Sequence, residues 1–244
     1  MSGADEQTAR LERARSRAVY IATPVARHPV SQYAIAMART LVRMTELGIR
    51  AYVQQVRGNS NLPRARNELV AGFLASDFDD LLFVDDDMGW HSNDVLRLLA
   101  STQDVIAGVG CKKVMRPDDD RHKWCFRPLE GPLRQDEMGA IEVAGVGTGF
   151  VKISRAVFMR FIAEHPDWRR LAPDKMPAAA RAWYYQIFRF STDRYDEAGE
   201  DLGFCEEWRR MGGSIWIDPT IKLVHVGDHE FTGDFAAMLQ AEED

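Results

Sequence analysis

The chain has 244 residues, of which 45% are apolar and 28% are charged, as in an ordinary globular domain. Lysine and arginine number 31 against 37 aspartates and glutamates, so the net charge is −6. An acidic chain is a poor binder of duplex DNA, whose affinity comes mainly from neutralised phosphates, and we expect no nucleic-acid partner. The three cysteines form no CxxC pair, which argues against a disulfide framework or a cysteine zinc site and favours a reducing, cytoplasmic compartment.

We expect neither a transmembrane segment nor an export signal. No run approaches the ~18 apolar residues that cross a bilayer. Residues 1–17 contain four arginines but no apolar stretch after them, unlike a secretory signal. This segment is either a solvated polar tail or a short amphipathic helix whose arginines touch an anionic lipid surface, and we expect the tail. Residues 231–244 are expected to form an acidic tail.

The first half of the chain alternates short apolar runs with segments of helical periodicity. This alternation predicts a β-α-β-α-β-α-β order, and therefore a parallel sheet covered by helices on both faces. The expected strands are 18–23, 49–56, 80–84 and 104–109, and the expected helices are 30–47, 63–74 and 92–101.

The second half is less regular. Residues 111–139 are rich in proline, glycine and charge and predict a long excursion with one hairpin. No linker divides the chain, so we expect a single domain over residues 18–230. Further along we expect strands over 141–144, 150–153, 184–190, 214–217 and 221–226, helices over 155–163 and 201–211, and a loop over 165–182.

Three adjacent carboxylates follow the most apolar strand. Leu81–Val84 would cross the core, and Asp85, Asp86 and Asp87 would then emerge at the carboxyl edge of the sheet, where ligands of open α/β sheets bind. Because three adjacent anions repel one another, this arrangement favours a hard divalent cation such as Mg²⁺ or Mn²⁺. The alternative is a polar strand end or a helix-capping cluster. Asp118–Asp120 has no apolar run before it and is expected to be a solvated loop.

The segment Phe83-Val84-Asp85-Asp86-Asp87-Met88-x-Trp90 resembles the DxD segment of GT-A-fold glycosyltransferases, particularly the family 2-like group. The likeness spans residue 18 to about residue 230. Other segments agree with that group in order: Arg64–Val70, Gly147–Phe150 followed by Ser154-Arg155, Glu200–Cys205, Gly213–Pro219 and His225–Gly227.

The resemblance implies an α/β, GT-A-like (nucleotide-diphospho-sugar transferase) fold, a three-layer sandwich with a central, mostly parallel sheet. Residues 18–110 would bind the nucleotide-sugar and 111–230 the acceptor. The implied activity is metal-dependent transfer of a hexosyl group from a UDP- or GDP-sugar to a hydroxyl of a glycan, lipid-linked or protein acceptor, by a soluble enzyme or one in peripheral membrane contact. The implied metal is Mn²⁺ or Mg²⁺.

The resemblance also assigns the metal ligands. It makes Asp87 a ligand, has Asp85 reach both nucleotide and metal, and places Asp86 on the nucleotide-sugar side. His225 follows a short β run and would be a third ligand, since neutral imidazole suits Mn²⁺. The alternative for His225 is a loop histidine, which we prefer for His229.

Further donor-side and acceptor-side residues are implied in the same way. On the donor side, Thr23 and Pro24 would cradle the base, while Arg66 and Asn67 would contact the nucleotide or buttress the aspartates; a surface position is the alternative for Arg66. Lys112 and Lys113 would meet phosphate or be solvated. The acceptor-side residues would be Gly147, Thr148 and Gly149, whose alternative is a tight turn.

Inverting transfer needs a carboxylate that removes the proton of the acceptor hydroxyl. The resemblance gives this role to Asp201, with Glu200 second. Both open an expected helix, where capping is the alternative. Inversion is slightly favoured over retention.

Three other functions remain as alternatives. A nucleotidyltransferase that makes a sugar nucleotide would carry a glycine-rich loop after the first strand, but Pro24–His28 contains no glycine. A haloacid-type phosphatase would need a DxDx[TV] motif near the N-terminus, which Asp85–Gly89 lacks. A non-catalytic sugar-nucleotide-binding domain would not require Glu200 and Asp201.

Overall fold

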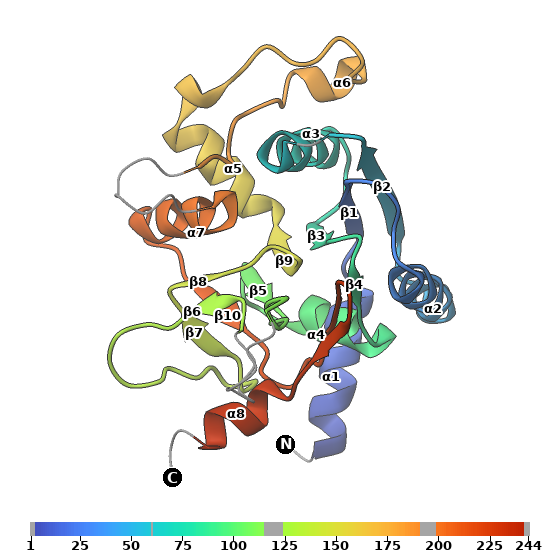
Figure 1. Cartoon of the computed structure of the whole chain (residues 1–244), viewed down its shortest axis with the longest axis vertical. Coiled ribbons are helices and arrows are strands. Elements are labelled where there is room, and N and C mark those ends of the chain that lie inside the picture. The colour runs from blue at the N-terminus through green and yellow to red at the C-terminus, as the bar shows by residue number, and fades with distance from the viewer. Residues whose placement is uncertain (1–2, 60, 115–123, 191–198, 242–244) are drawn as a thin grey trace.

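The computed structural model describes residues 3–59, 61–114, 124–190 and 199–241 of the chain. Within these residues the fold is α/β, with a central seven-stranded sheet between two layers of helices (Figure 1). The strand order is β2-β1-β3-β9-β5-β10-β7. All strands run in one direction except β9 and β7, so the sheet is mostly parallel, as expected.

The elements of the first half are α1 (Gly3–Arg15), β1 (Val19–Val25), α2 (Ser31–Leu47), β2 (Ala51–Arg57), α3 (Leu62–Leu74), β3 (Asp80–Val84), β4 (Met88–Gly89), α4 (Ser92–Ala100) and β5 (Val105–Ala107). Those of the second half are β6 (Phe126–Arg127), β7 (Ile141–Val143), β8 (Gly145–Val146), β9 (Phe150–Ser154), α5 (Arg155–Glu164), a 3₁₀ turn (Pro166–Trp168), α6 (Ala178–Arg181), α7 (Glu200–Arg210), β10 (Ile215–Ile217), β11 (Val224–Val226), β12 (Glu230–Thr232) and α8 (Phe235–Ala241).

The β-α-β alternation predicted for the first half is confirmed. Strand β3 is buried on both faces, which explains its continuous apolar run. Its side chains alternate: Leu81 and Phe83 face the core beneath α3, α5 and α7, whereas Leu82 and Val84 face the core beneath α1, α2 and α4. The strand therefore anchors both helical layers and fixes the position of the residues that follow it.

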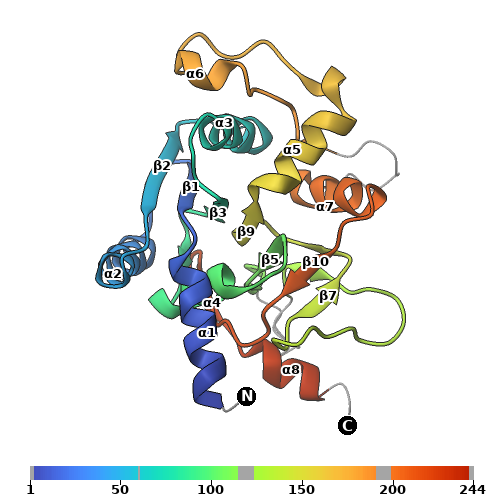
Figure 2. The same cartoon turned by 180° about the vertical axis from the view of Figure 1, so that it is seen from behind.

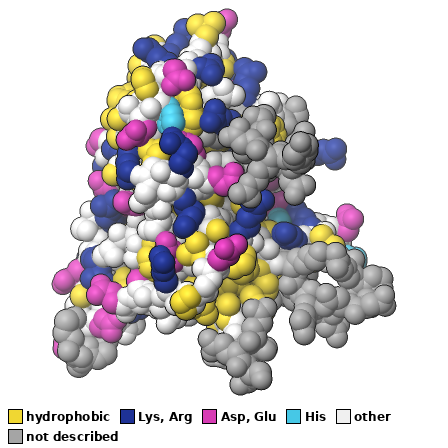
Figure 3. Space-filling view, turned by 90° about the vertical axis from the view of Figure 1, so that its left-hand side faces the viewer, with side chains coloured by type: hydrophobic (Ala, Val, Ile, Leu, Met, Phe, Trp, Pro, Cys, Tyr) yellow, Lys and Arg dark blue, Asp and Glu magenta, His cyan; other side chains and the backbone are white. Residues whose placement is uncertain are grey.

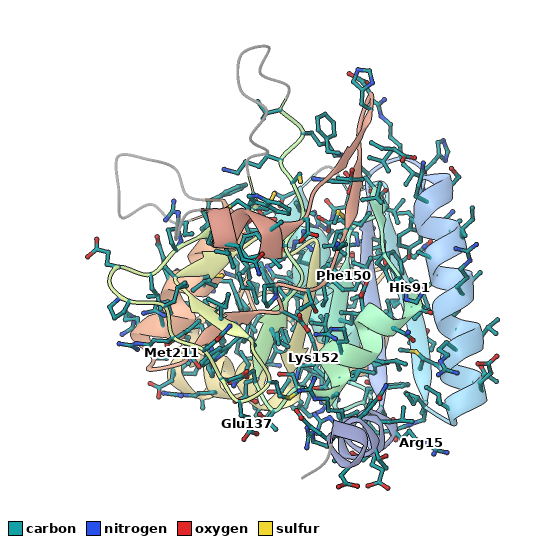
Figure 4. All side chains as sticks on the ribbon, turned by 90° about the horizontal axis from the view of Figure 1, so that it is seen from below. Arg15, His91, Glu137, Phe150, Lys152 and Met211 are labelled. Carbon is teal, nitrogen blue, oxygen red and sulfur yellow. The ribbon has the colours of Figure 1, made fainter. Side chains whose placement is uncertain are left out.

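Strand β9 runs antiparallel between β3 and β5. Its labelled residues Phe150 and Lys152 lie in the middle of the molecule in Figure 4. The buried Lys152 ammonium donates to the carbonyls of Ser101 and Gln103, which compensates its loss of hydration. This strand brings a second-half segment directly beside the end of β3.

The expected solvated tail over residues 1–17 is wrong for most of its length, because the alternative, a short helix, forms there. Helix α1 lies against α4 (Figure 2). Ala14 is buried in the contact, and the Arg13 guanidinium donates to the carbonyl of Ala100, 3.0 Å away. The apolar spacing is sparse in this segment, so periodicity alone favoured the tail.

The expected acidic tail over residues 231–244 is also wrong in its described part, which holds the end of β12 and helix α8. Phe235 is buried and packs edge-on against the rings of Trp124 and Phe126. Together with Met238 and Leu239, which pack against the same core, this aromatic side chain fastens the last helix.

The strand expected over residues 184–190 is absent among the described residues, apart from a single bridge between Arg169 and Tyr185. The side chain of Asn67 instead holds this segment: its amide donates to the carbonyl of Phe188 and accepts from the same residue's N–H. Ile187 and Phe188 of the segment are buried in the core beneath α3 and α7 rather than by a neighbouring strand.

No helix in the described ranges is both long and apolar enough to cross a membrane. Basic and acidic side chains are interspersed on the face shown in Figure 3.

Candidate functional site

The candidate site begins where β3 ends. The N–H of Asp85 donates to the carbonyl of Gly149, which ties the first carboxylate of the cluster to the segment before β9. The Arg66 guanidinium on α3 lies beside it, with its Nη2 2.9 Å from Asp85 Oδ1. The Nε of Arg66 is 3.3 Å from Oε1 of Glu200, the first residue of α7. Arg66 therefore joins carboxylates from both halves of the chain.

Arg66 is only 2% exposed, which rules out the surface position considered for it. Its guanidinium lies 5.1 Å from the centre of the Phe83 ring, so apolar β3 also supports the cation. Its Nη1 is buried and forms no hydrogen bond among the described residues. The arginine buttresses the carboxylates and keeps one donor unused.

A cavity of about 250 Å³ opens beside Arg66. It brings together seven separate segments of the sequence, as the parallel-sheet argument predicts for the carboxyl edge. Met88, Cys125 and Leu223 give it apolar surface that sequence reasoning missed, because their positions depend on long-range contacts. The predicted site residues that line it are Arg66, Asp85, Gly147, Thr148, Gly149, Glu200, Asp201 and His225.

His225 is oriented by the backbone. Its Nδ1 is 2.7 Å from the carbonyl oxygen of Cys111, and because that oxygen only accepts, Nδ1 carries the proton. In the neutral ring Nε2 then presents a lone pair, and it lies 3.5 Å from Oδ1 of Asp87. This oxygen is buried and has no hydrogen-bond partner among the described residues. Asp87 Oδ1 and His225 Nε2 thus present two lone pairs close together.

Lys113 forms an ion pair with the other oxygen of Asp87. Burial alone would raise the pKa of Asp87, but the His225 ring, when it is protonated, and the Lys113 ammonium outweigh burial, so the pKa lies below its ordinary value. The sequence placed Lys113 near phosphate or solvent. Its pairing with Asp87 was missed because it depends on how the chain leaves β5.

Asp86 points away from this pair. Its Oδ2 accepts a hydrogen bond from the N–H of Ala26, just after β1. Burial and then the charge of neighbouring Asp87 raise its pKa above the ordinary value. The three adjacent aspartates therefore have three different environments.

Asp201 and Glu200 lie at the start of α7. Asp201 Oδ1 accepts from the N–H of Leu202, 2.8 Å away, so the capping alternative is met in part, while the side chain also lines the cavity. Glu200 is buried and engaged by Arg66. Of the two carboxylates, Asp201 has the fewer hydrogen bonds to charged groups among the described residues.

The glycine segment is shaped by close approach to Asp85. A side chain at Gly149 would place its Cβ 3.2 Å from Asp85 Oδ2, closer than most real Cβ contacts. The neighbouring Thr148 is 3% exposed, and its hydroxyl has no hydrogen-bond partner in the described structure. This segment is therefore more than a plain turn, since it leaves a buried polar group facing a cavity.

Other predicted residues do not line the cavity. Thr23 is buried in β1, and its hydroxyl hydrogen-bonds that of Tyr33, while Pro24 is buried in the same strand. Asn67 binds the backbone of Phe188, as described above. Exposed His229 contributes its backbone carbonyl to the turn after β11.

The second aspartate cluster, Asp118–Asp120, lies outside the described residues. Within the described parts of the chain, no three histidine, cysteine, aspartate or glutamate side chains form a ready-made metal centre.

Comparison with protein-family models gives no match, and no curated protein matches the chain.

Proposed function

We propose that this protein is a metal-dependent glycosyltransferase of GT-A-like fold that moves a sugar from a nucleotide-diphosphate donor to a hydroxyl acceptor. One observation carries the proposal: Asp85, the glycine segment, the carboxylates of α7 and His225 line one cavity, and Asp87 lies beside His225. The three-layer arrangement with a mostly parallel sheet supports the same family of folds.

The donor set fits Mn²⁺ or Mg²⁺. Asp87 offers a buried oxygen without a hydrogen bond, and His225 offers an oriented imidazole nitrogen. Two protein ligands suffice where substrate phosphates complete the coordination, which is usual for Mg²⁺ in nucleotide sites. When bound, the ion would neutralise the negative charge that grows on the departing nucleoside diphosphate. Asp87 and His225 would hold it, and Asp85 would lie beside them.

Asp201 is the better candidate for the general base. The salt bridge to Arg66 engages Glu200, whereas Asp201 lines the cavity and keeps one oxygen outside any hydrogen bond among the described residues. A carboxylate beside the glycine segment would accept the proton of an acceptor hydroxyl as that oxygen attacks the anomeric carbon. This assignment favours inversion.

The buried donors of Arg66 and Thr148 would orient the sugar. Arg66 Nη1 and the Thr148 hydroxyl are buried polar groups without partners beside the same cavity, and such groups are costly unless a ligand or water satisfies them. Sugar hydroxyls supply the matching acceptors.

The test is titration of UDP and of GDP by calorimetry, each with and without Mn²⁺. We expect one nucleotide to bind more tightly with the metal. Asp87→Asn should weaken this metal-dependent gain at least ~10-fold, since even outer-shell partners of metal ligands contribute that much.

Asp234→Asn is the matched control, because Asp234 also forms a carboxylate–lysine ion pair, with Lys222, but lies away from the cavity residues. It should leave the gain unchanged. Equal losses in the two variants, or binding that ignores Mn²⁺ altogether, would contradict the proposal.

A further inference from the structure

A second hollow lies on the other side of α3 from the cavity. Its volume is about 850 Å³, and it is bounded by the first residues of α3 and by the segment between α5 and α7. The cavity and this hollow share one wall: Leu62 and Arg66 of α3 line the cavity, whereas Pro63 and Asn67 line the hollow. We call it the basic groove, after the side chains of Arg64, Arg170, Lys175 and Arg189 that line it.

Most cations of the basic groove form no ion pair with a carboxylate of the described residues. Arg64 pairs with Glu68, but no described carboxylate forms an ion pair with Arg170, Lys175 or Arg189. Three neighbouring cations without an ion pair in the described part of the chain, with a single acidic side chain among the lining residues of the groove, favour an anion supplied from outside.

The shape of the groove is maintained by neutral partners. Arg170 donates to the backbone carbonyls of Asp167 and Arg169, and the Arg189 guanidinium stacks 3.9 Å above the Trp168 ring. These contacts position the cations and leave their charge intact. Asp174 is the one acidic side chain among the groove's lining residues.

Two large apolar side chains project beside these cations. Leu171 is 97% exposed and Phe190 is 58% exposed, and both line the groove. Leucine has no aromatic face on which a sugar could stack, so its full exposure next to cations is better matched by an acyl chain than by a glycan. Basic side chains beside projecting apolar ones are the pattern of proteins that rest on anionic bilayers.

The segment is also placed where a flat surface can reach it. The connection between α5 and α6, which carries Leu171 and Lys175, forms the upper edge of the molecule in both Figure 1 and Figure 2. The acidic groups elsewhere on the protein oppose binding weakly, because the Debye length in physiological salt is about 8 Å.

We propose that the basic groove binds anionic lipid at a membrane surface, with Arg170, Lys175 and Arg189 contacting headgroup phosphates while Leu171 and Phe190 enter the acyl boundary. Lipid binding does not depend on the proposed function. If the proposed function also holds, the shared wall of α3 would bring a lipid-linked acceptor next to the cavity.

The experiment is co-sedimentation of the full chain with vesicles of phosphatidylcholine alone and of an equal mixture with phosphatidylglycerol, at low and high ionic strength. We expect binding to the mixed vesicles only, weakened by salt. Arg170→Glu with Lys175→Glu should weaken it by at least about 25-fold, since each cation near an anionic surface contributes about fivefold. Leu171→Asp should weaken it about tenfold, because an inserted side chain is lost.

The matched control is Arg39→Glu with Arg57→Glu, which reverses two exposed cations that do not line the groove. It should bind like the wild type, and circular dichroism will confirm that each variant is folded. Equal binding to neutral vesicles, or equal losses in the two charge-reversed pairs, would overturn the proposal. Binding to soluble dextran sulfate but not to mixed vesicles would also overturn it and would assign the groove to an acidic polysaccharide.

Discussion

In the first half of the chain, residues 18–110, regular strands and helices carry Asp85, Asp86 and Asp87 to the edge of the sheet. In the second half, residues 111–230, a turn, the start of helix α7 and a three-residue strand bring Thr148, Asp201 and His225 to the cavity that Asp85 also lines. The first half offers charge on a rigid frame, whereas the second half supplies groups that are held by single hydrogen bonds, such as that from His225 to Cys111.

This difference assigns different tasks to the two halves. Under the proposed function, a rigid frame of long strands suits tight binding of the nucleoside diphosphate that all sugar donors would share. Short segments that are held separately can vary without disturbing the sheet. Variants that separate binding from turnover, or that break the link between the halves, test this division.

The largest effect is expected from the second half, at Asp201. Asp201→Asn removes the proposed general base and should lower the rate of sugar transfer roughly 10²–10⁴-fold. Nucleotide affinity, which we assign to the first half under the proposed function, should stay near that of the wild type. The measurements are turnover with a panel of nucleotide-sugars and calorimetric nucleotide binding; unchanged turnover would point to another base or to a retaining mechanism.

The next effect concerns the residue that joins the halves. Arg66→Gln leaves Asp85 and Glu200 facing each other without their shared cation, and should lower the free energy of unfolding by about 3 kcal/mol. Arg97→Gln also removes an arginine from an ion pair, with Asp218, but its side chain is 38% exposed. Because exposed ion pairs contribute at most about 1 kcal/mol, its loss should be smaller. Urea denaturation compares the two, and equal losses would mean that Arg66 links the halves weakly.

The smallest effect is expected at Gly48, in a comparison of one glycine from each half. A Cβ at Gly213 would lie 2.0 Å from the buried ring of Trp208, so Gly213→Ala should cost about 3 kcal/mol, at the upper end for overpacking. Gly48 ends α2 with a φ of +68° and has open space around it, so Gly48→Ala should cost only about 1 kcal/mol. Thermal unfolding measures both, and a reversed order would show that helix α7 tolerates displacement from β10.

The sequence predicts these regions unequally for a physical reason. Strand β3 and helices α2 and α3 bury long faces, and burial of a long face requires a periodic pattern that can be recognised. Strands β8 and β11 have two or three residues, too few to show a period, and the 184–190 segment has a strand-like composition although Asn67 fixes it as a loop. Helix α8 packs through Phe235, Met238 and Leu239, whose long-range contacts no local pattern reveals.

The residues of the candidate site also differ in how well the sequence predicts their positions. The position of Asp85 follows from the strand before it, and motif order predicted that the glycine segment and α7 would lie nearby. The salt bridges of Arg66 and the pairing of Lys113 with Asp87 depend on contacts across the whole chain, so sequence reasoning placed these cations only in general terms.

The pairing of β4 with β11 has a consequence for how the protein is made. Met88, next to Asp87, lies opposite His225 in this small sheet. Contacts between segments so distant along the chain form slowly, and domains acquire structure from the N-terminus during synthesis. A nascent chain that has completed only its first half lacks β9, the strand between β3 and β5, and lacks the imidazole until residue 225 has left the ribosome, so the proposed metal-binding pair matures late.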